Sequence, residues 1–304
     1  SISGKQADHI PEFDYLTDTI HHLSCPYYYR APDGLSETEF TDSLVKEFEE
    51  KIIALGGGDK VAAFFAEPIM GSGGVIVPPE GYLKRMWEVC QANDILFVAD
   101  EVVTAFGRLG HWFASESVFD IKPDIITTAK GLTSGYQPLG ATIFSDRIWQ
   151  VISEPGNGRY FAHGFTYTGH PVACRAALKN IEIMERERIL EHVRDVGPYF
   201  LKQLKKLEQL PIVGEVRGDH FMVCIENVAN KDTKTLFDEQ IDIGQRITDE
   251  CARRGVLVRP IGHLNVLSPS LILNAEEIDR IVVTLGDSIS AVIADLKTEN
   301  LWSV

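Results

Sequence analysis

The chain has 304 residues and a mass of 33.9 kDa, which is room for one large domain or two ordinary ones. Apolar residues make up 44% of it, which excludes a disordered or low-complexity chain. Its net charge of −15 disfavours contact with nucleic acid or anionic lipid, and no apolar run approaches the roughly 18 residues that a membrane span needs.

The cysteines and the first residues set two further expectations. Five scattered cysteines form no C-x-x-C motif, so the sequence favours a reducing, cytoplasmic location and no metal site. Residues 1–15 contain no methionine and no helix or strand pattern. We therefore expect the chain to be part of a longer protein, or a truncated product of one.

The first half of the chain alternates helical patterns with short apolar runs. Apolar periodicity predicts helices over residues 36–55 and 80–93, and Ser36 with Glu39 forms a capping-box signal at the start of the first. Four short apolar runs predict strands at residues 61–66, 95–99, 124–128 and 140–144. This alternation predicts an α/β fold with a mostly parallel sheet flanked by helices.

Helical patterns dominate from about Pro171 onward. Helices are predicted at residues 171–186, 187–209, 233–254 and 275–296, with shorter β-like pieces at 211–227 and 256–273. Asn274, with Glu277 three residues later, is the predicted N-cap of the last helix. We expect a large domain over residues 1–172, incomplete at its N-terminal side, and a smaller α+β domain over residues 173–304.

Ionisable residues end three of the predicted strands, at Glu67, Asp100 and Lys130. Ligands bind beyond the carboxyl ends of strands in open parallel sheets, so we expect these side chains to converge on one rim. An apolar pocket favours the neutral amine of a lysine, which can form a Schiff base with an aldehyde such as pyridoxal phosphate. The pyridine nitrogen of this cofactor needs a nearby carboxylate. Lys130 and Asp100 fit these two roles, whereas Glu67 is explained by shaping the strand end and is left outside the site.

Residues 162–171 supply a candidate phosphate-binding segment. The segment has glycines that allow close backbone approach, and hydroxyl groups at Thr166 and Thr168. Pro171 marks the first turn of the following helix, whose free N–H groups would meet a phosphate.

Two charged residues near these motifs are given structural interpretations. Glu101 follows Asp100 and points to the opposite face of the strand, so a structural role explains it as well as a catalytic one does. Arg108, within F-G-R-L-G, is interpreted as structural rather than substrate-binding.

Several motifs together resemble a known family. Four segments, in this order and spacing, resemble the class III aminotransferases, which are fold type I enzymes dependent on pyridoxal phosphate: AEPIMGSGGVIVPPEGYL, ILFVADEVVTAFGRLG, PDIITTAKGLTSGYQPLGA and HGFTYTGHPVA. The resemblance covers essentially the whole chain. It implies that Lys130 is the Schiff-base lysine, that Asp100 pairs with the pyridine nitrogen and that Val102 packs against the cofactor ring. It also implies that Phe165 and Thr166 reach the phosphate of the neighbouring subunit, which requires a homodimer and leaves a tetramer open.

A finer resemblance concerns the substrates. Arg259, within R-P-I-G, lies where the amine:pyruvate and omega-amino-acid branch has a mobile arginine. This implies that Arg259 binds the carboxylate of the keto acid and swings aside for an amine that lacks one. The ornithine and 4-aminobutyrate branches have a glutamate in the loop that holds Ser72, and a glutamine where this chain has Val103. Both differences favour transfer of an amino group from an amine, polyamine or omega-amino acid to pyruvate.

Other functions stay open on the sequence alone. Family members are considerably longer at the amino end, where they carry a Gly-Ser phosphate loop and a tyrosine that stacks on the cofactor ring. The alternatives are therefore another class III aminotransferase or an aminomutase, or an inactive truncated fragment with only a dimerisation role. A metal hydrolase rests on scattered histidines alone. The sequence does not identify the amine donor.

Overall fold

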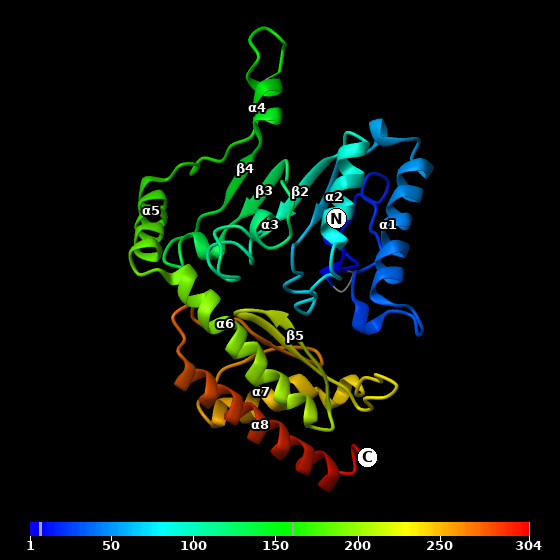
Figure 1. Ribbon diagram of the computed structural model, residues 1–304, viewed down its shortest axis with the longest axis vertical. Helices are drawn as coiled ribbons and strands as arrows, with labels where there is room; N and C mark the ends of the chain where they lie inside the picture. The colour runs from blue at the N-terminus through cyan, green and yellow to red at the C-terminus, as the bar shows by residue number, and fades with distance from the viewer. Residues whose placement is uncertain (6–7, 160, 304) are drawn as a thin grey trace. The chain divides into compact units, whose positions relative to one another are not determined.

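The computed structural model describes residues 1–5, 8–159 and 161–303 (Figure 1). No helix in these ranges is both long enough and apolar enough to cross a membrane. The α-helices and strands, in chain order, are α1 (Glu37–Ala54), β1 (Ala63–Ala66), α2 (Tyr82–Ala92), β2 (Leu96–Asp100), α3 (Ala114–Ser117), β3 (Ile125–Thr128), β4 (Ala141–Phe144), α4 (Asp146–Ser153), α5 (Pro171–Arg186), α6 (Ile189–Lys205), β5 (Val213–Asp219), β6 (Met222–Asn227), α7 (Ile243–Arg253), β7 (Arg259–Ile261), β8 (Leu264–Leu267) and α8 (Ala275–Thr298).

Two compact units divide the chain. The first comprises residues 1–64 with 78–97, and the second comprises residues 65–77 with 98–304. Strands β1 and β2 each begin in the first unit and end in the second. The site residues predicted from the sequence all belong to the second unit. A domain division near residue 172 stays a prediction.

Helices α1 and α2 carry the first unit. The Ser36 side chain accepts the N–H of Glu39, and the Glu39 carboxylate accepts the N–H of Ser36 at 2.9 Å, which confirms the predicted capping box. Arg85 of α2 donates to Asp42 of α1 at 2.6 Å. The ion pair and the buried apolar stripe of α1 therefore hold these two helices together.

The first sheet has the strand order β1-β2-β3-β4. All four strands lie within two residues of the predicted runs, and β2 pairs with β3 in parallel. Strand β4 runs antiparallel to β3, with Ala141 opposite Thr128. It reverses because residues 129–140 form short turns rather than the helical crossover that a parallel return requires. The α/β class is confirmed, with one antiparallel strand in this sheet.

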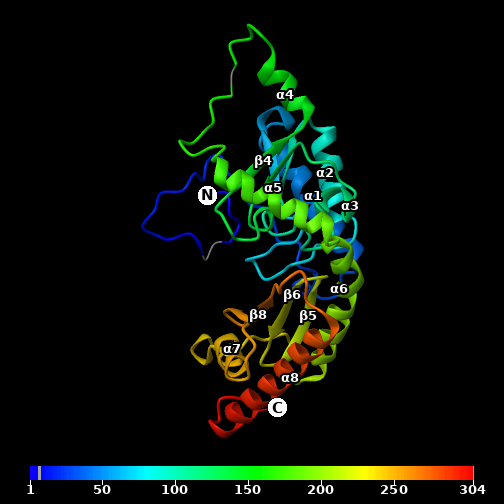
Figure 2. The ribbon, with the colours of Figure 1, turned by 90° about the vertical axis from the view of Figure 1, so that its left-hand side faces the viewer.

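The second sheet has the order β5-β6-β8-β7 and is antiparallel throughout. Side chains of β6 alternate between its two faces, as the period of a strand requires. Val223 and Ile225 join the core made with α6, α7 and α8, which pack on one face of the sheet (Figure 2). Met222 and Cys224 join a second apolar cluster on the other face, together with Ile69. This sheet is therefore buried on both faces.

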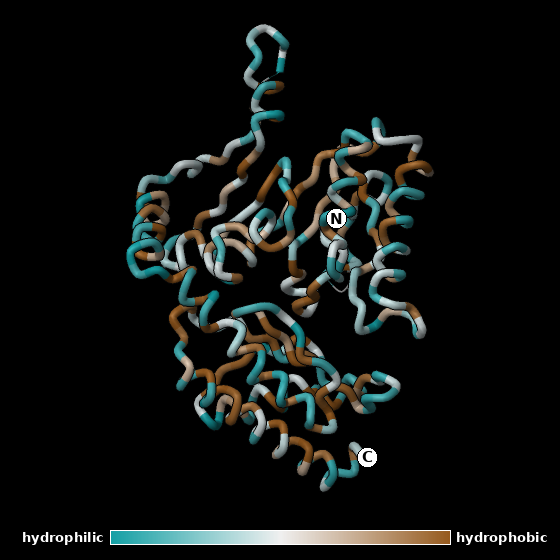
Figure 3. Tube along the Cα trace, viewed as in Figure 1, coloured by the Kyte–Doolittle hydropathy of each residue, from teal (hydrophilic) through white to brown (hydrophobic). Residues whose placement is uncertain are grey.

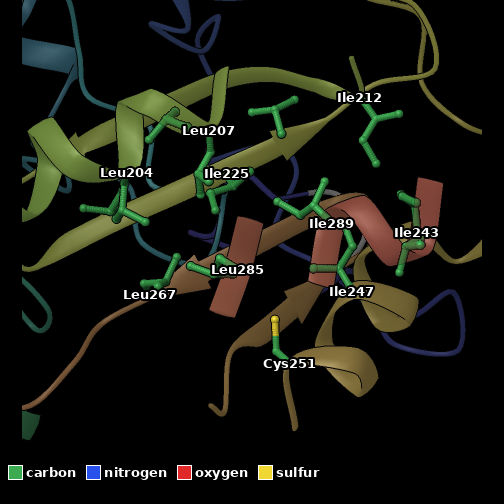
Figure 4. Close-up of a cluster of buried hydrophobic side chains, with 14 of the residues drawn as sticks. Leu204, Leu207, Ile212, Ile225, Ile243, Ile247, Cys251, Leu267, Leu285 and Ile289 are labelled. Atoms are coloured by element: carbon green, nitrogen blue, oxygen red, sulfur yellow. The ribbon is translucent and has the colours of Figure 1, made fainter. Parts of the chain in front are cut away.

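The larger core fills the space between the second sheet and its helices (Figure 4). Leu204 of α6, Ile225 of β6 and Ile289 of α8 are all fully buried within it. Figure 3 shows hydrophobic and hydrophilic residues alternating along α1 and α8, as expected for helices with one buried face. Asn274 caps α8 in a second capping box with Glu277, as predicted.

One predicted helix is too long. The sequence pattern predicted a helix over residues 233–254, but α7 begins at Ile243. The Asp238 side chain accepts the N–H of Gln240 and starts a separate 3₁₀ turn. Asp242 then adopts a left-handed backbone conformation with φ of +47°, which interrupts helical hydrogen bonding.

Candidate active site

Asp100 and Lys130 come from the ends of neighbouring parallel strands. Asp100 is the last residue of β2 and lies opposite Thr127 of β3. Lys130 follows Thr128, the last residue of β3, by two positions. Because the carboxyl ends of paired parallel strands lie at the same edge, the structure places both residues at one edge of the first sheet, where β2 and β3 end.

Asp100 is oriented by a turn that it forms with its own backbone. Its Oδ1 accepts the N–H of Val102 at 3.0 Å. Asp100 and Val102 are both half-buried. With one oxygen fixed in this way, the carboxylate holds a defined direction at the strand end.

Lys130 lies in a constrained turn. It begins a short 3₁₀ helix, Lys130–Leu132, with φ of +39°, which a lysine rarely adopts. Asn180 of α5 holds the turn by donating from Nδ2 to the carbonyl oxygens of Gly131 at 2.9 Å and Leu132 at 3.2 Å. A Cβ on Gly131 would lie 2.9 Å from the Cβ of Phe106, so this position requires glycine.

The apolar pocket expected around Lys130 is not formed by the described residues. The Lys130 side chain is exposed, and so are Thr142 and Ile143 of the adjacent strand β4. Strand β4 is the outer strand of this sheet, and its two middle residues, which point to opposite faces, are both exposed.

Glu67, which the sequence analysis left outside the site, is electrostatically linked to both residues. It is half-buried, and its Oε2 accepts the N–H of Gly71 at 2.8 Å. Burial raises the pKa of Glu67; Asp100 raises it further, while the Gly71 N–H and Lys130 lower it. The signal that could have revealed Glu67 was its position directly after β1, close to the position of Asp100 as the last residue of the neighbouring strand β2.

Glu101 has a structural role. Its side chain is fully buried, and both oxygens accept hydrogen bonds. Oε2 accepts the N–H of Ala114 at 2.6 Å and the hydroxyl of Thr104 at 3.0 Å. Oε1 accepts the N–H of Ser115 at 2.9 Å and its hydroxyl at 2.5 Å. Glu101 therefore binds the first N–H groups of α3, on the side of the strand opposite to Asp100.

Arg108 is also engaged by the backbone. Its Nη1 donates to the carbonyl oxygens of Phe221 at 3.0 Å and Pro269 at 2.6 Å. Burial lowers the pKa of Arg108 to about 10. These contacts join the loop after β2 to the second sheet and support the structural interpretation.

Phe165 and Thr166 lie on an exposed segment before α5. The Phe165 N–H donates to the Thr168 hydroxyl at 2.7 Å, and the chain turns there before Pro171 begins the helix. Phe165 is 73% exposed, and Thr166 is exposed too. Among the described residues, neither Phe165 nor Thr166 forms a hydrogen bond with Asp100 or Lys130.

Arg259 is the first residue of β7 and pairs with Val266 of β8. Its side chain is exposed on the edge strand of the second sheet. The described contacts do not join it to Lys130. Its place in the fold leaves the guanidinium accessible.

The groups at this edge of the first sheet fit an aldehyde cofactor that has a basic ring nitrogen. The amine of Lys130 supplies a point of covalent attachment, and the carboxylate of Asp100 supplies a partner for a protonated nitrogen. Lys130 and Asp100 lie at the ends of paired strands, and the charge of each shifts the pKa of Glu67. The fit therefore rests on two complementary groups held at one edge.

Comparison with known proteins identifies the family. A family model for class-III aminotransferases matches residues 1–289, and the chain belongs to this family. It is 41% identical over 98% of its length to a probable gamma-aminobutyrate transaminase 3, mitochondrial, of Oryza sativa subsp. japonica, of which it covers 59%. It is 39% identical over 97% of its length to the putrescine–pyruvate aminotransferase of Pseudomonas aeruginosa, of which it covers 64%.

A solved structure shows the same fold. The chain superposes on a PMP-bound form of an aminotransferase from Vibrio fluvialis with a TM-score of 0.88 and 36% identity, covering 97% of this chain and 65% of that one. The chain thus spans about three-fifths of the length of the curated relatives it matches.

Proposed function

We propose that this chain forms the pyridoxal-phosphate site of a transaminase that moves an amino group from an amine, polyamine or omega-amino acid to pyruvate. The observation that carries the proposal is the placing of Asp100 and Lys130 at the ends of paired parallel strands. Membership of the class-III aminotransferase family supports it.

Three residues at the sheet edge would hold the cofactor. Lys130 would attach through Nζ, Asp100 would face the ring nitrogen, and Val102 would pack against the ring. Bound pyridoxal phosphate supplies an aldehyde and a ring that accepts an electron pair. The Vibrio fluvialis neighbour, described as PMP-bound, supports this assignment because PMP is the amino form of the same cofactor.

Proton transfer would be shared between two of these side chains. The Asp100 carboxylate would keep a proton on the ring nitrogen, because the negative charge favours the protonated form. Lys130 Nζ, once released, would act as the general base that takes a proton from the donor carbon and returns it to the cofactor carbon. The exposed Lys130 side chain is consistent with an amine that moves between these tasks.

Arg259 would bind the carboxylate of the keto acid. A guanidinium grips a carboxylate through two parallel hydrogen bonds and is costly to bury beside an apolar group. Its exposed position on an edge strand supports a side chain that moves aside for an amine without a carboxylate.

Two residues support pyruvate as the acceptor. Ser72 is exposed in the loop after β1 and offers no carboxylate to engage an arginine. Val103 packs against the apolar cluster that contains Ile69 and Met222, and its side chain offers no hydrogen-bonding group. Among the relatives, the Pseudomonas aeruginosa protein is named a putrescine–pyruvate aminotransferase, whereas the rice protein is named a probable gamma-aminobutyrate transaminase. Comparing pyruvate with 2-oxoglutarate as acceptor tests this choice, and preference for 2-oxoglutarate would contradict it.

The active form would be a homodimer in the cytoplasm. Phe165 and Thr166 would reach the phosphate of the neighbouring subunit, and nearby aromatic residues support an interface there. Phe161 is 60% exposed and Trp149 is 54% exposed, and the rings of both contact that of Phe144, so they form an exposed aromatic cluster of the kind that marks interaction sites.

The proposal is tested by locating the attachment site of the cofactor. The chain is incubated with pyridoxal phosphate, reduced with borohydride and digested with trypsin, and the adduct is located by mass spectrometry. We expect a pyridoxyl adduct on Lys130. The Lys130→Arg variant keeps the charge but loses the reactive amine, so its adduct should disappear. Lys122→Arg is the control, because Lys122 is an exposed lysine paired with Glu116.

Three outcomes distinguish the candidates. An adduct on Lys130 supports the transaminase site. No adduct on this chain, but one on a version extended at its amino end, supports the site and shows that this chain alone is an inactive fragment. No adduct on either, or adducts spread over exposed lysines, would contradict the proposed function.

A further inference from the structure

A glycine-rich loop follows Glu67 and closes on itself. In this loop, residues 70–77, Met70 and Ile76 exchange two backbone hydrogen bonds of 3.0 Å each. The N–H groups of Gly74 and Val75 both donate to the Gly71 carbonyl oxygen at 3.1 Å. The loop is therefore a defined structure whose two ends move together.

Arg217 of β5 binds this loop from within a buried ion cluster. Its side chain is only 7% exposed. Nε donates to the Gly74 carbonyl oxygen at 2.9 Å, while Nη1 donates to Glu226 at 2.6 Å and to Glu215 at 2.9 Å. Glu226 is itself buried, with His263 Nε2 at 3.6 Å from its other oxygen. The guanidinium thus joins two carboxylates of the second sheet to the backbone of the loop.

Apolar packing leaves the loop little freedom against the second sheet. Val75 is buried in the same cluster as Met222 and Leu264. Gly74 has φ of +118°, and a Cβ there would lie 2.7 Å from Leu264 Cδ1. The backbone at Gly74 therefore approaches β8 as closely as a glycine permits.

The other end of the loop reaches the candidate active site. The Gly71 N–H donates to Glu67 at 2.8 Å, and a Cβ on Gly71 would lie 3.2 Å from Val103, just after the Asp100 turn. Any movement of the loop at Gly74 would be passed to Gly71 by their shared hydrogen bond. Arg217 and Glu67 are thus joined through one short backbone segment.

We propose that Arg217 is a positioning residue of the cofactor site: it fixes the glycine-rich loop through the Gly74 carbonyl oxygen, so that the Gly71 N–H holds the Glu67 carboxylate beside Asp100 and Lys130. The inference rests on the proposed function for what that carboxylate does, namely to strengthen the negative field that keeps a ring nitrogen protonated. An ion cluster that only stabilised the second sheet would not need a bond to the loop.

Lysine cannot replace arginine in this role. The guanidinium uses Nε for the Gly74 carbonyl oxygen and Nη1 for the carboxylates, in directions fixed by its plane. A lysine ammonium at the same place keeps the charge near Glu226 but cannot span both contacts. Arg217→Lys therefore releases the loop without leaving an uncompensated charge in the interior.

The chain offers a matched control at Arg246 of α7. Its Nε donates to the Ile241 carbonyl oxygen at 3.0 Å, and its Nη1 lies 2.9 Å from the Glu299 carboxylate. Like Arg217, it therefore bonds to a backbone carbonyl oxygen through Nε and to a carboxylate through Nη1, but it does not contact the glycine-rich loop. Arg246→Lys should reproduce any general effect of losing a guanidinium.

The experiment measures two properties of the wild-type chain, Arg217→Lys, Arg246→Lys, Glu67→Gln and the Arg217→Lys/Glu67→Gln double variant. Hydrogen exchange followed by mass spectrometry reports on the peptide that contains Gly71 and Gly74, and needs no cofactor. Titration with pyridoxal phosphate, followed by fluorescence, gives the dissociation constant. Should Arg217→Lys fail to fold by circular dichroism, Gly74→Ala disturbs the same contact from the loop side.

We expect the loop peptide of Arg217→Lys to exchange about tenfold faster, as loss of one hydrogen bond predicts, and that of Arg246→Lys to be unchanged. Arg217→Lys and Glu67→Gln should each weaken cofactor binding by about tenfold, and the double variant should be no weaker than Glu67→Gln. An unchanged rate of hydrogen exchange in the loop peptide of Arg217→Lys would overturn the inference. So would a double variant whose loss of cofactor affinity is the product of the two single losses. If neither the wild-type chain nor a version extended at its amino end binds pyridoxal phosphate, the proposed function is contradicted, while the exchange result still decides whether Arg217 holds the loop.

Discussion

The backbone N–H of Gly71 donates to the Glu67 carboxylate at 2.8 Å, four residues back along the chain. This bond and Lys130 favour the ionised carboxylate, but burial and Asp100 oppose it more strongly. The pKa of Glu67 therefore lies above its ordinary value in the folded chain. Keeping this carboxyl group ionised beside Asp100 reduces folding stability, which is a common property of functional sites.

Glu67→Gln should make the chain more stable near neutral pH. A carboxyl group whose pKa is raised by folding ionises first in the unfolded chain, so its contribution to stability is present below about pH 4.5 and is lost as pH rises through the folded pKa. Glutamine keeps the acceptor for Gly71 and removes the titration. Urea unfolding at a series of pH values should show that the free energy of unfolding of the variant, relative to that of the wild type, increases as pH rises. An equal difference at acidic and neutral pH would contradict this explanation.

The neighbours Asp100 and Glu101 should respond in opposite ways to amide substitution. Asp100→Asn still accepts the Val102 N–H, so unfolding free energy should change by less than about 1 kcal/mol, while transaminase activity falls by about a hundredfold. Glu101→Gln must turn an NH2 group toward an N–H or hydroxyl donor, and should cost about 3 kcal/mol. Urea unfolding and initial rates on the same preparations check both. Equal losses of unfolding free energy would contradict a structural role for Glu101 and a functional role for Asp100.

Arg259→Ala should affect acceptors more than donors. Loss of a charge-assisted hydrogen bond predicts a KM for pyruvate that is raised by about tenfold to a hundredfold, with little change for an amine that has no carboxylate. Arg253→Ala, which removes an exposed arginine of α7 paired with Glu250, is the control. Steady-state kinetics with each substrate varied in turn provide the measurement. Similar losses for both substrates would refute a switching role.

The caps of α1 and α8 should each stabilise the chain by a similar amount. Ser36→Ala and Asn274→Ala both remove a side-chain acceptor from a capping box, which predicts a loss of about 1 kcal/mol in unfolding free energy. Asn274→Asp keeps the acceptor and should retain most of the stability. Thermal and urea unfolding of the three variants test this. A loss in Asn274→Asp as large as that in Asn274→Ala would show that the cap is not responsible.

Local patterns were sufficient to predict most of the fold. The strands of the first sheet lie within two residues of the apolar runs, and both capping boxes form as the Ser36 and Asn274 motifs indicated. These features depend on residues close together in the sequence. The motifs around Asp100 and Lys130 also led to the family that the comparison with known proteins identifies.

The features that sequence reasoning missed depend on contacts between distant residues. The direction of β4 is set by the path of the chain after Lys130, and the start of α7 by the backbone conformation at Asp242. Glu67 gains its significance from Asp100 and Lys130, which follow it by more than thirty residues. The contact of Arg217 with the loop spans 143 residues of sequence, and no local pattern marks it.

The left-handed backbone at Lys130 has a consequence for how this family can change over time. A lysine with φ of +39° bears a conformational cost of about 1–3 kcal/mol, from which glycine is largely exempt. Replacement of this lysine by glycine would therefore relieve the backbone and remove the amine that we propose attaches the cofactor. A gene copy under relaxed selection that acquired glycine here would lose the proposed reaction without a conformational cost to this turn.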